Sequence, residues 1–224
     1  MSEADVIARG GRPLTEQGLA QSLRAMGLAS GDLALMHCAL SRIGWIVGGA
    51  QTVLAAVRRV VGPTGTIAMP AHSGQLSDPV EWSNPPVPSD WVQDIRDHMP
   101  IFDPARTPLR GMGQVADAFR AEPGTLRSAH PLVSMMAQGP MAADLVALHP
   151  LDFGLGPDTP WGRLYDAGAK VLLLGAGWTA CTALHQAEFR VRTPGRRTEM
   201  VPVGRRNGRT EWRQVSDVAA IMPA

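Results

Sequence analysis

The feature that most constrains the fold of this chain is a run of four aliphatic residues, Val171 to Leu174, that ends at Gly175. Such an uninterrupted apolar run is typical of a strand covered on both faces, as in a parallel sheet. Gly175 and Gly177 allow the backbone to turn sharply as it leaves the sheet. A helix-forming segment follows over 182–188. The pattern predicts a strand–turn–helix unit, and open α/β sheets bind ligands at the carboxyl ends of their strands.

The same pattern occurs earlier in the chain. Residues 15–26 have apolar positions at helical spacing, and Gly27 follows as a helix terminator. Short apolar strands are predicted at 32–36 and 66–70, with a helix over 48–60 between them. This alternation predicts an α/β fold with a central, mostly parallel sheet flanked by helices.

Other segments depart from this alternation. Residues 71–110 are rich in proline but contain two tryptophans, which favours an ordered insertion forming part of a substrate cleft over a disordered loop. Helices are expected at 113–120 and within 135–149. A C-terminal β-hairpin is predicted because Asn207-Gly208 separates two strand-like runs. We expect a single domain over residues 1–224 with a smaller lobe.

The charge balance limits the classes of partner. The 21 basic and 20 acidic residues leave a net charge of +1, which argues against a nucleic-acid-binding surface. No signal peptide opens the chain, and no apolar run approaches the length that spans a bilayer. Two cysteines make no disulfide framework, and no pair of histidines has metal-ligand spacing. We therefore expect a cytoplasmic protein with no metal and no nucleic-acid or membrane partner.

Two segments are candidates for ligand binding. Residues 37–41 lie between a predicted strand and the helix that Gly48-Gly49 opens, and backbone N–H groups at such a helix start attract phosphate. The segment matches neither a P-loop nor a dinucleotide motif, so ordinary turn chemistry is the alternative. Arg127 and His130 fall in a predicted loop because Pro131 favours extended backbone before it. They either line a polar site or only stabilise that loop.

The sharpest candidate for chemistry is the pair His185 and Glu188. Three residues apart on a helix, they place an imidazole and a carboxylate on one face. A neutral histidine can remove a proton near physiological pH, and a carboxylate on its other nitrogen raises its basicity. Asp217, just past the predicted hairpin, is a second possible partner. The alternative is a surface helix on which both side chains are merely solvated.

Seven segments, read in order, carry a resemblance to a known family: 36–50, 65–70, 82–86, 107–108 with 112–113, 127–131, 172–175 and 182–188. They resemble the motifs of the aminoglycoside 3-N-acetyltransferases, an antibiotic acetyltransferase family distinct from the GNAT superfamily. The first is similar to that family's V-H-S-S-L…G…G-G opening, the second to its G-T-L-x-M-P strand and the last to its T-x-L-H-x-x-E. The resemblance spans roughly residues 14–217, and the ordered series is more specific than any one motif.

The resemblance implies an α/β fold with a smaller second lobe, acetyl-CoA as donor and an amino-sugar antibiotic as acceptor. It implies that His185 is the general base and that an acidic residue near the C-terminus, here Asp217, orients it. The implied CoA-binding residues are His37, Cys38, Ala39, Leu40 and Ser41, with Gly48, Gly49, Arg127 and His130 as further candidates. Because the acceptor is polycationic, the carboxylates of the insertion are the candidate substrate-binding residues: Asp78, Glu81, Asp94, Asp97 and Asp103.

Two departures from the family pattern bear on activity. Cys38-Ala39 replaces paired serines, which loses hydroxyl contacts but keeps the backbone N–H groups. Family members continue past the strand before Asp217 into further helices, whereas this chain stops at Ala224. It is therefore expected to be a short variant or to lack a C-terminal part.

The predicted activity is direct acetyl transfer, without an acyl-enzyme, to the 3-amino group of 2-deoxystreptamine aminoglycosides, which confers antibiotic resistance. The chain is expected to act as a monomer or homodimer. Two alternatives stay open: a CoA-binding protein without catalysis, which the short C-terminus favours, and an acetyltransferase for a different amine.

Overall fold

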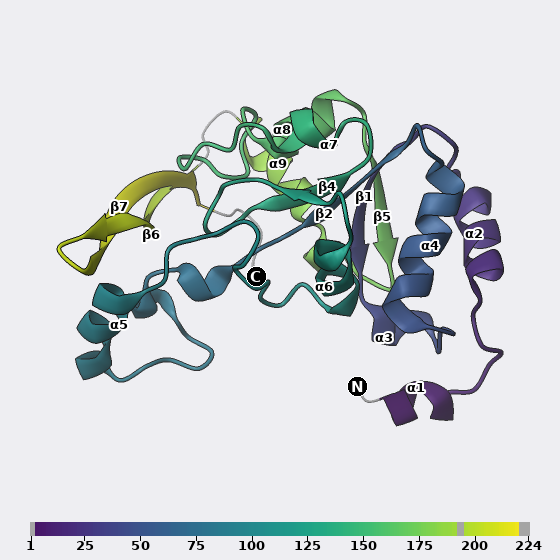
Figure 1. The fold of residues 1–224 in the computed structure, drawn as a ribbon, viewed down its shortest axis with the longest axis horizontal. Coiled ribbons are helices and arrows are strands. Elements are labelled where there is room, and N and C mark those ends of the chain that lie inside the picture. Colours follow the sequence, from purple (N-terminus) through teal and green to yellow (C-terminus); the bar gives the residue numbers. More distant parts are fainter. Residues whose placement is uncertain (1–2, 192–194, 220–224) are drawn as a thin grey trace.

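The computed structural model describes residues 3–191 and 195–219, and its helices cover a central sheet beside a smaller lobe (Figure 1). The sheet contains β1 (Leu33–Cys38), β2 (Thr66–Pro70), β3 (Leu126–Arg127), β4 (Met135–Gln138) and β5 (Lys170–Leu174) in the order β3-β4-β2-β1-β5. β1 pairs in parallel with β2 and β5, whereas β4 pairs antiparallel with β2 and β3. Four of these five strands therefore run in one direction. The predicted α/β class, with its flanked central sheet, is confirmed as a mixed sheet.

Helices cover both faces of this sheet because nearly every residue of its central strands β1 and β2 is buried, and most of these residues are apolar. Alternate residues of β1 point to opposite faces, with Ala34 and Met36 on one side and Leu33 and Leu35 on the other. The first face is covered by α2 (Glu16–Ala25), α4 (Gly49–Val61) and α6 (Gln114–Ala121). The second face is covered by α7 (Ala142–Val146) and α8 (Pro160–Asp166). Burial on both sides accounts for the apolar runs of β1 and β2. The expectation that Val171–Leu174 is covered on both faces is wrong: β5 is an edge strand, Val171 is 41% exposed and only Leu172 is buried.

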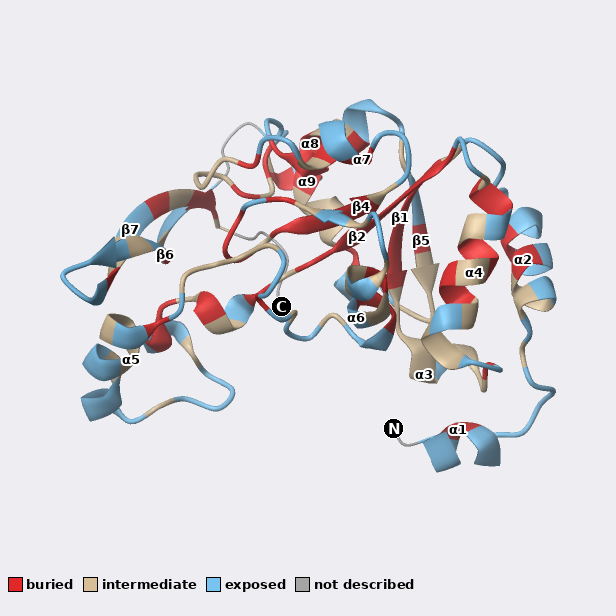
Figure 2. Cartoon of the chain, viewed as in Figure 1, coloured by how far each residue is buried: buried red, intermediate tan, exposed pale blue. Residues whose placement is uncertain are grey.

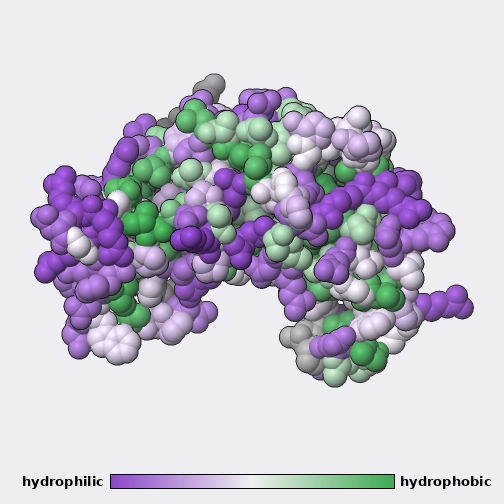
Figure 3. Space-filling model, viewed as in Figure 1, coloured by the Kyte–Doolittle hydropathy of each residue, from purple (hydrophilic) through white to green (hydrophobic). Residues whose placement is uncertain are grey.

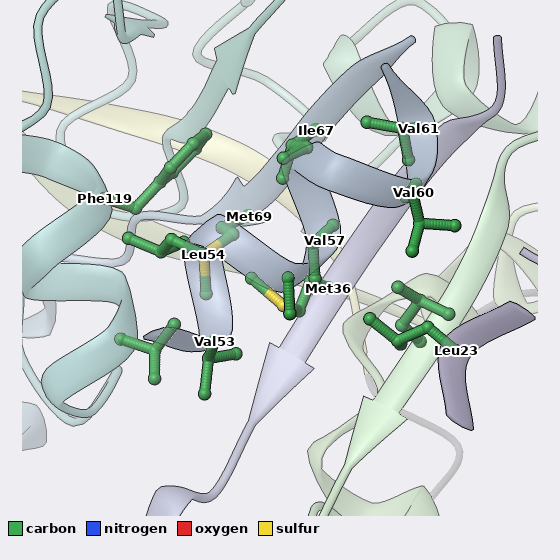
Figure 4. Packing of buried hydrophobic residues seen from close by; sticks show 14 of the residues in the cluster. Leu23, Met36, Val53, Leu54, Val57, Val60, Val61, Ile67, Met69 and Phe119 are labelled. Carbon is green, nitrogen blue, oxygen red and sulfur yellow. The ribbon is translucent and has the colours of Figure 1, made fainter. Parts of the chain in front are cut away.

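The larger core lies between α4 and the sheet. Leu54 and Val57 of α4 pack against Met36 of β1 and Met69 of β2, and all four are at most 2% exposed (Figure 4). Removing each such side chain from water contributes about 1.5–3 kcal/mol to folding. Figure 2 shows this buried centre as continuous red ribbon in β1 and β2, with exposed residues in α5 and at the hairpin tip.

The predicted insertion is ordered and forms the smaller lobe together with the hairpin. It contains the 3-10 helices η1 (Gly74–Leu76), η2 (Pro79–Glu81) and η3 (Ser89–Trp91), followed by α5 (Val92–His98). The hairpin consists of β6 (Arg196–Arg206) and β7 (Arg209–Val218). Asn207 and Gly208 both have positive φ, 50° and 81°, as a tight hairpin turn requires. The predicted C-terminal hairpin is confirmed.

The helix expected within 135–149 is α7, but the same range also contains a strand that the sequence pattern did not predict. Met135–Gln138 forms strand β4, and α7 begins at Ala142. Met135 and Ala137 face the α7 and α8 layer while Met136 faces the α4 layer. Pairing with β2 and burial on both faces outweigh the helix preference of the methionine, alanine and glutamine residues in this run.

The remaining elements are short. They are α1 (Glu3–Ala8), α3 (Leu40–Ile43), the 3-10 helices η4 (Trp178–Ala180) and η5 (Thr182–Leu184), and α9 (His185–Glu188). Within the described ranges, no helix is long and apolar enough to cross a membrane.

Candidate active site

A cavity of about 400 Å³ lies at the carboxyl ends of the central strands. Its wall includes His37 and Cys38 of β1, Pro70 of β2 and Ala176 after β5, with Thr182 three residues before His185. Figure 3 shows the outline of the molecule hollowed below these strand ends, between the lobe and α1. The strand ends of this α/β sheet thus meet around one cavity, where ligands of such folds bind.

Gly175 fixes the path of the chain from β5 towards this cavity. Its φ of 65° is left-handed, and a Cβ there would lie 2.7 Å from the carbonyl oxygen of Ala39. Only glycine therefore fits where the turn after β5 passes the segment that follows β1. Gly177 has an ordinary φ of −90°.

His185 and Glu188 lie together on α9. Nδ1 of His185 is 2.8 Å from Oε2 of Glu188, and the Glu188 side chain is 7% exposed whereas that of His185 is 32% exposed. The carboxylate therefore holds one imidazole nitrogen and leaves Nε2 available for a ligand. Gln186, between them, anchors this short helix by donating from Nε2 to the carbonyl oxygens of Leu155 and Gly156.

Asp217 lies on β7 and contacts Arg197. Nη2 of Arg197 donates to Oδ2 of Asp217 at 3.1 Å, and the backbone N–H of Val218 donates to its Oδ1 at 2.8 Å. Burial raises the pKa of the neighbouring Glu199; Arg197 opposes this rise, and Asp217 and Glu81 add to it. The described carboxylate contact of His185 is with Glu188, so the orienting role of Asp217 stays a prediction.

The segment 37–41 forms the end of β1 and the beginning of α3. The N–H of Ala39 donates to the carbonyl oxygen of Leu174, which ties this segment to β5 at 2.9 Å. Gly48 precedes α4 in a left-handed conformation with φ 74°. Burial raises the pKa of the Cys38 thiol to about 12. The thiol is therefore protonated at neutral pH and is a poor nucleophile.

Arg127 contacts protein acceptors with its whole guanidinium group. Nε donates to Ser134 Oγ at 2.9 Å, Nη1 to the carbonyl oxygen of Thr107, and Nη2 to Ala71 O at 2.8 Å and Ser73 Oγ at 3.2 Å. Burial lowers the pKa of Arg127 to about 10, so the group stays charged. These contacts tie the insertion to the sheet, and a role in CoA binding stays a prediction.

His130 is completely buried. The backbone N–H groups of Leu132 and Val133 donate to its Nδ1 at 3.1 Å, and its Nε2 lies 3.3 Å from the carbonyl oxygen of Leu151. Burial lowers its pKa to about 4, although Leu151 and the charge of Asp217 act in the opposite direction. His130 is therefore neutral near pH 7 and holds the loop that follows β3.

The five candidate acidic residues of the insertion have different surroundings. Asp78 is buried and accepts two hydrogen bonds from Arg96, at 2.9 and 2.6 Å. Asp97 pairs with Arg209 at 3.3 Å, and Asp103 accepts from backbone N–H groups of its own loop. The other two, Glu81 and Asp94, are exposed.

Sequence reasoning did not assign a site role to His72, which lies two residues after β2. Its ring meets the indole of Trp161 edge-on, with ring centroids 6.1 Å apart. Burial lowers the pKa of both His37 and His72 to about 4. The position of His72 just past a strand end is the same signal that marked His37 in the sequence. Among the described residues, no group of three or more His, Cys, Asp or Glu could hold a metal ion.

Comparison with known proteins places this geometry in a family. The family model described as aminoglycoside 3-N-acetyltransferase matches residues 35–222. The chain is 46% identical over 180 residues to the SPbeta prophage-derived aminoglycoside N(3')-acetyltransferase-like protein YokD of Bacillus subtilis (strain 168), an alignment covering 80% of this chain and 66% of the relative. It is 41% identical over 227 residues to the aminoglycoside N(3)-acetyltransferase VIII of Streptomyces fradiae, covering 97% of this chain and 76% of the relative.

Solved structures agree with these matches. The crystal structure of YokD superposes with a TM-score of 0.91 at 39% identity and covers 97% of this chain and 80% of its own. The binary complex of AAC-IIIb with CoASH has a TM-score of 0.79 at 36% identity, and the match covers 95% of this chain and 78% of the AAC-IIIb chain. AAC-VIa bound to sisomicin has a TM-score of 0.78 at 35% identity, and the match covers 93% of this chain and 77% of the AAC-VIa chain. The chain spans a little under two thirds of the length of the Bacillus relative and about three quarters of the Streptomyces one. The chain belongs to the aminoglycoside 3-N-acetyltransferase family.

Proposed function

We propose that the protein transfers the acetyl group of acetyl-CoA to the 3-amino group of 2-deoxystreptamine aminoglycosides, with His185 as general base, and thereby confers resistance to them. The observation that carries this proposal is the His185–Glu188 pair beside the cavity at the strand ends. Glu188 holds Nδ1 of the imidazole at 2.8 Å, so that Nε2 can take a proton from the acceptor nitrogen.

The donor is proposed to lie in the cavity whose wall includes His37, Cys38 and Ala39. Its volume of about 400 Å³ is proposed to take the pantetheine arm, and the start of α4 at Gly48 and Gly49, outside the residues that line this cavity, is proposed to bind the pyrophosphate. A structural neighbour in complex with CoASH supports this choice of donor. We further propose that backbone N–H groups around residues 37–41 stabilise the oxyanion that forms when the thioester carbonyl is attacked.

The transfer is proposed to be direct. The Cys38 thiol lines the cavity proposed for the donor, and burial raises its pKa to about 12, which keeps it protonated. Holding amine and thioester in one cavity supplies much of the rate by proximity. The alternative of an acyl-enzyme on this cysteine is therefore disfavoured.

The acceptor is proposed to approach from the lobe. A structural neighbour bound to sisomicin supports an aminoglycoside as acceptor. Glu81 and Asp94 are the exposed candidates for its ammonium groups, whereas Asp78, Asp97 and Asp103 would act by shaping the lobe, given their contacts within it.

The test is a thiol-release assay with acetyl-CoA and a panel of amines, including aminoglycosides. We expect His185→Ala to lower kcat by about 100-fold or more because proton transfer is lost, while calorimetry shows unchanged acetyl-CoA affinity. His98→Ala, on the exposed side of α5, is the matched control and should keep full turnover. Full turnover by His185→Ala would remove the general base from the mechanism. Binding of acetyl-CoA without thiol release, or release only with a non-sugar amine, would overturn the proposed reaction.

A further inference from the structure

Two more histidines share the sheet face that leads to His185. Parallel pairing of β1 and β2 places Leu35 beside Ala68, so two residues further along His37 comes beside Pro70, with His72 just beyond. Leu35 and Ala68 both pack in the cluster that contains Trp161. Because side chains alternate along a strand, His37 lies on that same face. The edge-on contact of His72 with Trp161, at 6.1 Å between ring centroids, brings the second histidine to the same place.

Three nitrogen atoms at this place are buried and have no hydrogen-bond partner among the described residues. They are Nε2 of His37, Nε2 of His72 and Nε1 of Trp161. His37 is only 7% exposed, and Trp161 2%. Burying a polar atom without a partner costs free energy, and proteins usually satisfy such atoms with ordered water. Three such atoms from β1, the segment after β2 and α8 define a small polar compartment inside an otherwise apolar layer.

This compartment adjoins His185. Ala183, two residues before His185, packs against the same Trp161 cluster. After burial, the charges that lower the pKa of His72 come from His37 of β1, His130, His185 of α9 and Arg127 of β3. These groups surround His72 from each neighbouring element, and all of them disfavour its protonation. The imidazole is therefore neutral at working pH and keeps a free lone pair.

The chemistry of the proposed reaction requires two protons to leave one nitrogen. An ammonium acceptor, R–NH₃⁺, and acetyl–S–CoA become R–NH–CO–CH₃, CoA–SH and one free proton. The nitrogen must lose its first proton before it can attack the thioester carbonyl. The second leaves as the C–N bond forms and the C–S bond breaks, and it ends on the sulfur. His185 can accept both, but only if it releases the first before the second arrives.

We propose that His37 and His72 are positioning residues that, through ordered water held on their Nε2 atoms, carry the first proton from His185 away to solvent. The relay rests on the acetyl transfer proposed above. Each imidazole accepts a proton at one nitrogen and releases one from the other, so neither histidine gains or loses a proton overall. Because both are neutral, they add no positive charge beside a polycationic acceptor.

The test compares pH profiles of kcat/KM for the acceptor at saturating acetyl-CoA. We expect His72→Phe to lower kcat/KM for the acceptor about tenfold or more at pH 6.5, where the acceptor amine arrives protonated. At pH 9 a larger share of the amine arrives neutral and only one proton must leave, so the loss should shrink to about twofold. His72→Gln and His37→Gln keep polar side chains that cannot pass a proton and should show the same dependence. They replace the phenylalanine variant if it does not fold.

His98→Phe is the matched control, and its ratio to the wild type should stay near one at both pH values. A loss in His72→Phe and His72→Gln that is equal at pH 6.5 and pH 9 would mean a purely structural role and overturn the relay alone. Wild-type protein that releases no thiol with any aminoglycoside would overturn the proposed function and, with it, the relay.

Discussion

His37, Cys38 and His72 show how burial controls the protonation of single side chains at the strand ends. Each is largely withdrawn from bulk solvent there, and burial disfavours the charged form of each group. The pKa of both histidines falls to about 4 and that of the thiol rises to about 12. All three are neutral at pH 7. The neutral histidines do not repel a cationic acceptor, and the protonated thiol does not attack the thioester of the donor.

Cys38 should accordingly be unreactive in the folded protein. With a pKa near 12 the thiolate fraction at pH 8 is about one in ten thousand, so alkylation by iodoacetamide should be at least 100-fold slower than for a free thiol. Peptide mapping by mass spectrometry follows the rate at Cys38, and the same protein in urea is the control. Rapid labelling without denaturant, or an acetyl group found on Cys38 after mixing with acetyl-CoA, would contradict this prediction.

The insertion and the hairpin, as elements, stabilise each other and are both tied to the sheet. Nε1 of Trp212 on β7 donates to the carbonyl oxygen of Arg96 on α5 at 2.9 Å. Arg209 pairs with Asp97 at 3.3 Å, which adds a second contact between the same two elements. Arg127 on β3 then holds the start and the end of the insertion at once, through Ala71 and Thr107. The lobe is thereby positioned over the strand ends.

Replacing Arg127 with Met should therefore loosen the insertion. The variant loses four hydrogen bonds from a charged, partly buried donor and leaves their acceptors unsatisfied, so we expect the free energy of unfolding to fall by about 3 kcal/mol. Urea unfolding measures this change, and limited proteolysis should cut within 71–110. Arg24→Met, at an exposed position of α2, is the control, and its free energy of unfolding should stay within about 0.5 kcal/mol of the wild type. A similarly small effect of Arg127→Met, accompanied by weaker acetyl-CoA binding, would assign Arg127 to the donor instead.

Across the whole molecule, the interior contains an unusual number of neutral imidazoles. Burial lowers the pKa of His37, His72 and His130 to about 4 and that of His149 to about 3. They come from β1 and from the segments after β2, β3 and α7, so they meet only in the folded protein. His149 is held by Ser128 and the carbonyl oxygen of Gly154. Together they couple the stability of the fold to pH.

The stability should fall as the pH is lowered from about 6.5 to about 4. Between pH 6.5 and pH 4 these histidines are protonated in the unfolded chain but not in the folded chain, so unfolding takes up protons. Above about pH 6.5 they are neutral in both states, and the full stability is present. We expect a loss of several kcal/mol between pH 7 and pH 5. Urea titrations at a series of pH values measure it, and His98→Phe should leave the slope unchanged. A flat profile in this window would contradict the neutral interior.

Much of the fold was accessible from local sequence patterns. Short continuous apolar runs predicted β1, β2 and β5, and Asn207-Gly208 predicted the hairpin turn, because each signal lies within a few consecutive residues. The juxtaposition of His185 and Glu188 was equally accessible, since three residues on a helix fix the distance between two side chains. Strand β4 was missed because its four residues gain their extended form from pairing with β2 and β3.

The sequence by itself determined the strands β1, β2 and β5 and the C-terminal hairpin, where the chain turns between them, and that an imidazole and a carboxylate lie side by side after a strand end. Only the tertiary structure decided the partners of groups far apart in the chain. Asp78 pairs with Arg96, Arg127 reaches Ala71 and Thr107, and His72 meets Trp161. Local patterns arise from backbone geometry over one or two turns. Burial, and the neutral state that it imposes, arises only when distant segments pack together and exclude water.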